Sequence, residues 1–182
     1  MLLSEAKENE MIKENMNVLF VCTGNVFRSM SAEYCLRDLL RTKGIKTVHV
    51  SSAGTEANPQ DLPQPVLRKL RSYGIAAEMH VQRRLSSDIL AQTDLVIAMA
   101  EDHQRFIKEQ FGIDVPLFNE ICEDKKTSVL DLGDAVPDWQ SHRTEAIRFL
   151  DWTVTYIHDR MPRVLDCIVK QDRKCKLRTK EN

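Results

Sequence analysis

The sequence is short of several features that would each suggest a particular function. Its 26 basic and 27 acidic residues nearly cancel to a formal net charge of -1, so no overall field indicates a nucleic-acid or membrane binder. No apolar run approaches the roughly 20 residues that a transmembrane helix needs, and the charged start of the chain lacks the apolar region of a secretory signal. We therefore expect a cytoplasmic protein, with no nucleic-acid partner and no stable membrane insertion.

The cysteines also lack the spacings of metal or redox sites. They form neither a Cys-x-x-Cys pair nor a zinc-type arrangement, and no other cluster of metal ligands is visible. We expect no metal, no cofactor and free thiols, as in a reducing compartment. The five cysteines lie at positions 22, 35, 122, 167 and 175.

Length and composition suit one domain with tails. The chain has 182 residues, of which 42% are hydrophobic, which is typical of a globular protein. The pattern changes abruptly at residue 17, so we predict a solvated arm over residues 1–16 and a domain over 17–160. Pro162 is predicted to end the last helix, followed by a basic extension over 161–182. A monomer or weak dimer is expected.

Apolar runs alternate with helical stripes along this domain. Strands are predicted at residues 18–21, 47–51 and 94–99, with a short fourth strand near 115–118. Helices are predicted at 29–41, 63–73, near 86, at 101–110 and at 143–158, and a long loop at 120–138. Strands separated by helices indicate right-handed crossovers. The sequence therefore predicts an α/β fold, with a small four-stranded parallel sheet of the Rossmann-like or flavodoxin-like kind and helices on both faces.

A Cys-x5-Arg-Ser motif joins the first predicted strand to the first helix. In open α/β sheets ligands bind at the carboxyl ends of strands, where the next helix directs its N-terminal amides and positive dipole end. The five residues inside the motif are enough to curl their amides around one phosphate group. We predict that inorganic phosphate or a similar oxyanion binds this loop, on Thr23, Gly24, Asn25, Val26, Phe27 and Ser29.

The motif also supplies a nucleophile and a clamp. The guanidinium of Arg28 can fork onto two phosphate oxygens, which a lysine cannot do with the same geometry. The same positive groups favour the thiolate of Cys22, and the Ser29 hydroxyl lies within reach of that sulfur. A lone cysteine at the end of a strand is usually buried and inert. The combination of strand, motif and helix instead indicates a transient phosphocysteine.

These residues resemble the signature of the low-molecular-weight protein tyrosine phosphatase family, which reads approximately Cys-x-Gly-Asn-x-Cys-Arg-Ser-Pro. The likeness covers about residues 17–160. The Ser-Ala-Gly-Thr stretch at 52–55 is similar to the family's turn after the second strand, and residues 94–99 are similar to its third strand. The resemblance implies a cysteine-dependent phosphatase that acts on a phosphorylated protein.

The resemblance also implies roles for individual residues. Cys22 would be the nucleophile and Arg28 the clamp that stabilises the transition state. Asn25 would hold the loop in shape, tied to Ser52 and supported by His80.

The family takes its general acid from an aspartate on a late loop. The matching stretch here, Ala-Val-Pro-Asp-Trp, implies Asp138, which would later act as the base for the attacking water. Asp134 and Asp131 are nearby competitors. Trp139 replaces the family's proline after the acid, and it either stacks on an aromatic substrate or packs against the core.

One further position departs from the family pattern, and another bears on the choice of substrate. Phe27 replaces the second loop cysteine, so the family's disulfide inside the loop is not available. Val26 stands where tyrosine-directed relatives carry an aliphatic residue and protein-arginine phosphatases carry threonine. We therefore expect phosphotyrosine first, with protein-arginine phosphatase activity as the alternative.

Two further functions have to be weighed from the residues alone. Thioredoxin-coupled arsenate reductase shares a similar loop, but its chemistry needs two more cysteines after the third strand, and residues 99–102 contain none. That function is disfavoured. A non-catalytic phosphate-binding pseudophosphatase or adaptor is the second alternative.

Overall fold

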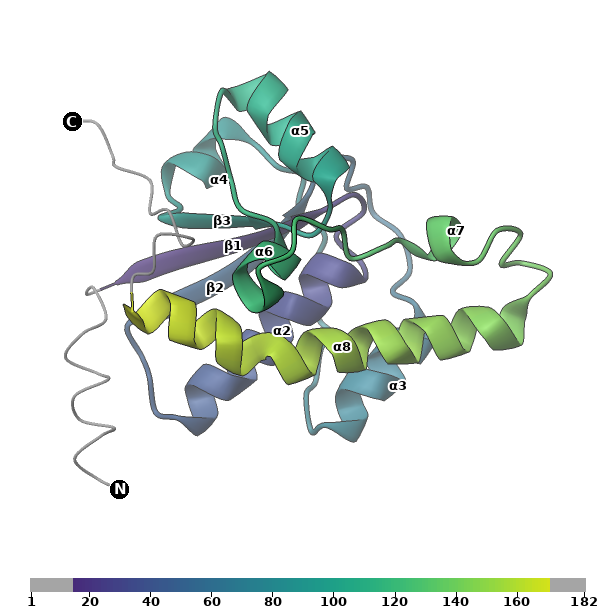
Figure 1. Ribbon diagram of the computed structural model, residues 1–182. Helices are drawn as coiled ribbons and strands as arrows, with labels where there is room; N and C mark the ends of the chain where they lie inside the picture. Colours follow the sequence, from purple (N-terminus) through teal and green to yellow (C-terminus); the bar gives the residue numbers. More distant parts are fainter. Residues whose placement is uncertain (1–14, 171–182) are drawn as a thin grey trace.

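The computed structural model describes residues 15–170 and arranges them in three layers (Figure 1). A parallel sheet forms the middle layer. Its two faces are covered by different helices: α2 (Arg28–Thr42), α3 (Gln64–Ser72) and α8 (Arg143–Lys170) on one, and α4 (Ser87–Ala91) and α5 (Glu101–Phe111) on the other. The predicted α/β fold with helices on both faces is confirmed.

The sheet contains β1 (Met16–Cys22), β2 (Val48–Gly54) and β3 (Leu95–Ala98). Their order is β2-β1-β3 and every pairing is parallel, which is the start of a flavodoxin-like topology. Cys22 pairs with Gly54, and Val21 pairs with Ala98. The carboxyl ends of all three strands therefore meet at one edge, next to Cys22.

The predicted fourth strand does not form, so the expectation of four strands is corrected to three. The segment near residues 115–118 makes a single parallel bridge, between Ala98 and Leu117. Pro116 has no amide hydrogen to donate to a ladder, and α6 (Phe118–Glu123) begins immediately afterwards. The extended stretch is therefore too short to continue as a strand.

Alternate residues of β1 supply two hydrophobic cores. Val18 and Phe20 pack with α2, α3 and α8, whereas Leu19 and Val21 pack with residues of α4, α5 and β3. All four side chains are buried. A central strand covered on both faces explains the continuous apolar run in the sequence.

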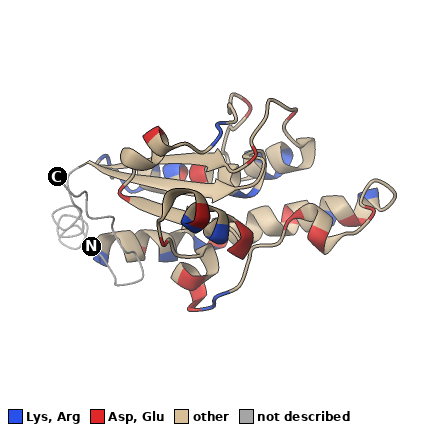
Figure 2. Ribbon diagram, turned by 90° about the horizontal axis from the view of Figure 1, so that it is seen from above, with Lys and Arg blue, Asp and Glu red and all other residues tan. Residues whose placement is uncertain are grey.

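Charged side chains stay off the sheet. Figure 2 shows Lys and Arg interspersed with Asp and Glu over the helices and loops, while the strands contain none of the four. No helix among the described residues is long and apolar enough to cross a bilayer.

The last helix is longer than predicted. α8 runs through Pro162 to Lys170, so the prediction that Pro162 ends it is wrong. A proline inside a helix costs about 3 kcal/mol. Beyond it, however, Val164, Leu165 and Ile168 are buried in the core, and each such side chain contributes about 1.5–3 kcal/mol. Packing therefore outweighs the missing hydrogen bond.

Two short helices lie where a loop was predicted over 120–138. α6 extends into this stretch, and α7 (Leu132–Ala135) lies within it, capped by Asp131, whose Oδ1 accepts a 2.8 Å hydrogen bond from the Leu132 amide. Helices of four to six residues are too short to leave an apolar period in the sequence. The other predicted helices form within a few residues of their expected bounds.

Most of the described cysteines are free thiols. Cys22, Cys35 and Cys122 are free and buried, whereas Cys167 is disulfide-bonded. The expectation of free thiols is therefore wrong at Cys167, a pairing that sequence spacing alone does not reveal.

Candidate active site

The Cys-x5-Arg loop lies at the carboxyl edge of the sheet, as its position between strand and helix requires. Cys22 ends β1 and Arg28 begins α2. The loop crosses directly over Gly54 of the neighbouring strand: a Cβ atom there would lie 2.3 Å from the Thr23 carbonyl oxygen and 3.0 Å from the Asn25 amide nitrogen. Only glycine leaves room for this path.

The Cys22 sulfur faces the start of α2. Its Sγ lies 2.9 Å from the Ser29 Oγ, and both residues are buried. The predicted contact between the two side chains is therefore present. Burial raises the pKa of Cys35 and of Cys122 to about 12 and keeps both of these thiols protonated.

Asn25 holds the middle of the loop. Its backbone has φ 57°, a left-handed conformation that asparagine tolerates better than most residues. Its Nδ2 donates to Ser29 Oγ at 3.0 Å and to Ser52 Oγ at 2.7 Å, and its Oδ1 accepts from the Arg83 amide at 3.0 Å. One fully buried amide thus joins β2, α2 and the segment before α4.

His80 and Glu33 support Asn25 from the far side. His80 Nε2 donates to the Asn25 carbonyl at 2.8 Å, and Ser52 Oγ donates to Glu33 Oε2 at 2.6 Å. His80 Nδ1 lies 3.9 Å from the same Glu33 oxygen. Burial lowers the pKa of His80, against the opposing effects of its bond to Asn25 and of Glu33. Glu33 was not predicted from the sequence, although it lies one helical turn after Ser29.

Arg28 is anchored on several sides. Its Nη1 donates to the Val129 carbonyl at 3.0 Å. Its Nη2 donates to Thr23 Oγ1 at 3.3 Å and to Asp131 Oδ2 at 2.7 Å. The side chain of Arg28 is only 4% exposed, whereas that of Asp131 is 42% exposed. The guanidinium is therefore fixed in place while its acidic partner reaches it from the surface.

A buried histidine extends this arrangement and was missed in the sequence. His103, on the first turn of α5, places Nε2 2.9 Å from Thr23 Oγ1. Because that hydroxyl has two lone pairs, it can accept from both Arg28 and His103 or donate to His103, and the tautomer of the imidazole decides which. Burial, followed by the charge of Arg28, lowers the pKa of His103 to about 4. A histidine this far along the sequence gives no signal of contact with the loop.

Asp138 lies apart from these groups. It is exposed with φ 54°, and its carbonyl accepts from the Ser141 and His142 amides, which makes it a turn residue. Among residues 15–170, its side chain makes no hydrogen bond or ion pair to the loop. Trp139, 42% exposed, shares a pocket with Val26, Phe27 and Asp131. The structure thus brings Asp131, and not Asp138, to the clamp.

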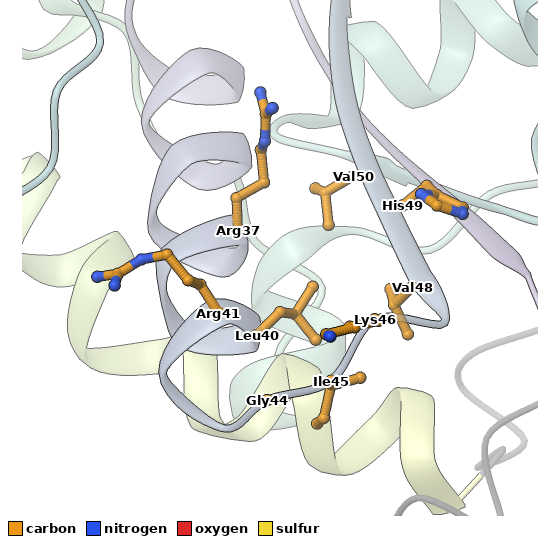
Figure 3. A pocket seen from close by; sticks show the side chains of 9 residues that line it. All are labelled: Arg37, Leu40, Arg41, Gly44, Ile45, Lys46, Val48, His49 and Val50. Atoms are coloured by element: carbon orange, nitrogen blue, oxygen red, sulfur yellow. The ribbon is translucent and has the colours of Figure 1, made fainter.

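A second hollow lies at the opposite end of the sheet and carries none of this chemistry. About 390 Å³ in volume, it opens between the end of α2 and the start of β2. Figure 3 shows Leu40, Ile45 and Val48 around it, with Arg37 and Arg41 on the helix side. Both arginines are paired within α2, with Glu33 and Asp38 respectively. Ligands of α/β sheets bind at the other edge.

Fold and loop together define a Cys-x5-Arg protein on a flavodoxin-like sheet. The profile of the family described as low molecular weight phosphotyrosine protein phosphatase matches residues 17–173. The chain therefore belongs to this family.

Individual relatives agree with this membership. A protein-arginine-phosphatase from Bacillus subtilis is 37% identical over 53% of this chain and 64% of its own length. The low molecular weight protein-tyrosine phosphatase A of Mycobacterium bovis is 28% identical over 81% of this chain and 93% of its own. The first curated relatives are matched over only 56% to 64% of their own length.

Solved structures share the whole fold. A YwlE arginine phosphatase with a phosphorylated active-site serine has a TM-score of 0.73 at 27% identity, covering 88% of this chain and 99% of its own. A low molecular weight protein tyrosine phosphatase from T. tengcongensis has a TM-score of 0.70 at 26% identity, covering 83% and 98%.

Proposed function

We propose that the protein hydrolyses phosphate monoesters on phosphorylated proteins through a phosphocysteine formed on Cys22. The observation that carries this proposal is the 2.9 Å contact of Cys22 Sγ with Ser29 Oγ at the start of α2, with Arg28 fixed at the same loop. A hydroxyl donor and a helix N-terminus favour the thiolate. Residues 17–160 would carry this activity.

The first step would transfer the phosphoryl group to sulfur. The Cys22 thiolate attacks phosphorus, the bond to the leaving oxygen breaks, and that oxygen takes a proton from a carboxylic acid. The guanidinium of Arg28 and the loop amides neutralise the charge on the equatorial oxygens.

The second step would regenerate the thiol site. The same carboxylate, now ionised, takes a proton from water, whose oxygen attacks phosphorus and breaks the bond to sulfur. Inorganic phosphate leaves, Cys22 returns as the thiolate, and the acid is again protonated. The two steps as proposed use no metal and no cofactor.

We assign the acid to Asp131 rather than Asp138 or Asp134. The support is the 2.7 Å contact between Asp131 and Arg28, because an acid that serves the leaving group must lie beside the group that binds the phosphate. Asp138 is exposed in a turn, and Asp134 is exposed on α7. Asp138 remains the alternative implied by the family stretch.

Phosphotyrosine is the favoured substrate and phosphoarginine the second candidate. Val26 and Phe27 place two apolar side chains on the loop itself, a setting that suits an aryl ring better than a guanidinium. One relative is named protein-arginine-phosphatase, which supports phosphoarginine as the second candidate. Matched peptides carrying phosphotyrosine or phosphoarginine decide between them by kcat/KM, and a preference for phosphoarginine would reverse the order.

The decisive experiment compares wild type with Cys22→Ser on a small aryl phosphate. Wild type is expected to release phosphate and Cys22→Ser to release none, while Cys22→Ser still binds inorganic phosphate. A pseudophosphatase or adaptor predicts the opposite for wild type: binding without turnover. Trp152→Ser, an exposed residue on α8, serves as the matched control.

The proposal includes a cellular setting. A nucleophilic thiol must stay reduced, which favours the cytoplasm. A monomer or weak dimer is expected there, and size-exclusion chromatography with light scattering measures it.

A further inference from the structure

A large apolar pocket opens beside the loop and is not needed to hold a phosphate. Its volume is about 740 Å³, within the range of about 300–1,000 Å³ typical of ligand sites. Val26 and Phe27 of the loop and Asp131 form the side nearest the chemistry, whereas Cys22 does not line it. The pocket therefore adjoins the phosphate position and extends away from it.

The far side of the pocket is built by three helices. Pro63 and Pro65 come from the start of α3, Leu132 from α7, and Ile147 and Leu150 from the first turns of α8. Figure 1 shows α7 and the start of α8 extending together away from the sheet. The lining therefore combines the loop with helices that lie far apart in the sequence.

The lining is mostly apolar with a polar rim. Phe27 and Leu150 are buried, while Ile147 (38% exposed) and Trp139 present large apolar surfaces to water. Its charged side chains are those of Asp61 and Asp131, which are acidic, and of Arg143, which is basic. Exposed apolar surface gathered in a hollow marks a binding site for an apolar group.

We propose that this pocket binds an apolar side chain of the substrate, two residues away from the phosphorylated residue. The inference rests on the proposed function and names a feature of its substrate. An extended peptide directs residues i and i±2 to the same side, about 6.5–7 Å apart. With residue i in the loop, residues i±1 point to solvent, and one of the i±2 side chains faces the pocket.

Five phosphopeptides test the position. Each has a central phosphotyrosine in a serine background, with one phenylalanine at -2, -1, +1 or +2, or with none. Burial of a phenylalanine predicts a kcat/KM about tenfold or more higher for the -2 or the +2 peptide than for the peptide without one. A gain below about twofold at both of these positions, or a larger gain at -1 or +1, overturns the proposal.

One pair of variants tests whether the phenylalanine binds in this pocket. Ile147→Asp puts a charge on the pocket wall, and Trp152→Ser changes an exposed residue on the same helix that does not line the pocket. The ratio of kcat/KM with and without phenylalanine is measured within each variant. It is expected to fall to about 1 in Ile147→Asp and to stay at the wild-type value in Trp152→Ser. A ratio that Ile147→Asp leaves unchanged overturns the assignment.

Failure of the two proposals is distinguishable. If wild type hydrolyses an aryl phosphate but shows no phenylalanine preference, the function stands and the pocket proposal falls. If no phosphate is released from any substrate, the function falls, and fluorescence anisotropy of the five labelled peptides on Cys22→Ser decides the pocket. The -2 or +2 peptide must then bind about tenfold tighter than the peptide without phenylalanine, and equal affinities overturn the proposal.

Discussion

Arg28 Nη2 donates a 2.7 Å hydrogen bond to Asp131 Oδ2, between residues 103 positions apart in the sequence. The pair joins the phosphate clamp to the acid that we assign to the leaving group. An arriving phosphate competes with Asp131 for the guanidinium. Because Asp131 is partly exposed and Arg28 is held by Val129 and Thr23, it is the aspartate that can shift toward the leaving oxygen.

Asp131→Asn tests this assignment. Loss of a general acid and base typically costs about 10²–10⁴ in rate, so kcat for an aryl phosphate with a poor leaving group is expected to fall by that factor. The Asn side chain can still accept from the Leu132 amide, so the cap of α7 is retained. The decrease in kcat should be smaller for a substrate whose leaving group needs no proton.

Asp138→Asn is the matched control. We expect kcat within about threefold of wild type, since its side chain is exposed in a turn. A large loss in Asp138→Asn with a small one in Asp131→Asn would return the role to Asp138.

Asn25 is expected to hold the loop by both its backbone and its amide. Asn25→Ala removes three hydrogen bonds and strains a left-handed backbone, so the free energy of unfolding should fall by about 3 kcal/mol. Asn25→Gly loses the same bonds without the strain and should be about 1 kcal/mol more stable than Asn25→Ala. Urea denaturation measures both, and an unfolding free energy for Asn25→Ala equal to that of wild type contradicts the role.

Gly54→Ala is expected to displace the loop from the strand below it. Its new Cβ would meet backbone atoms of Thr23 and Asn25, which cannot move without the loop. Inorganic phosphate binding, measured by calorimetry, should weaken at least about tenfold, and the unfolding free energy should fall by about 1–3 kcal/mol. Gly133→Ala, with nothing within 4 Å of the added Cβ, is the stability control and should not unfold more easily. Wild-type phosphate affinity in Gly54→Ala would show that the loop tolerates the displacement.

Much of the fold and half of the site were predictable because their signals are local. The apolar run of β1, the stripe of α2 and the spacing from Cys22 to Arg28 are read within a few residues. Their positions in the fold follow from the rules for parallel sheets.

What the sequence did not reveal depends on distant contacts or on small energy differences. His103 reaches Thr23 across 80 residues, and Asp131 reaches Arg28 across 103. Nothing in a single sequence decides between Asp131 and Asp138, because any loop aspartate also suits a turn or a cap. Pro162 was misjudged because a local rule was outweighed by burial further along α8.

His103 should make stability depend on pH. It sits against Arg28, Asp102 and Asp131, and its Nδ1 is buried with no hydrogen-bond partner among the described residues. Protonation would therefore add a charge with no acceptor beside the guanidinium. Its pKa of about 4 in the folded protein lies below the ordinary value of 6.5.

The sign of the effect follows from proton binding. Between pH 6.5 and about 4 the unfolded chain binds a proton at this position and the folded protein does not, so acid favours unfolding. The contribution is fully present above pH 6.5 and is lost as the pH falls through this window, amounting to about 3 kcal/mol. The lowered pKa of His80 acts in the same direction.

His103→Gln isolates the contribution of this residue. Glutamine can still form a hydrogen bond with Thr23, as donor or acceptor, but does not titrate, so the loss of unfolding free energy between pH 6.5 and 4 should be about 3 kcal/mol smaller than in wild type. Urea denaturation at half-unit intervals of pH measures it, with His49→Gln, an exposed residue of β2, as the control that should follow the wild-type curve. Parallel curves for wild type and His103→Gln would mean that His103 accepts a proton in the folded protein as readily as in the unfolded chain, which would contradict its assignment as a neutral side chain.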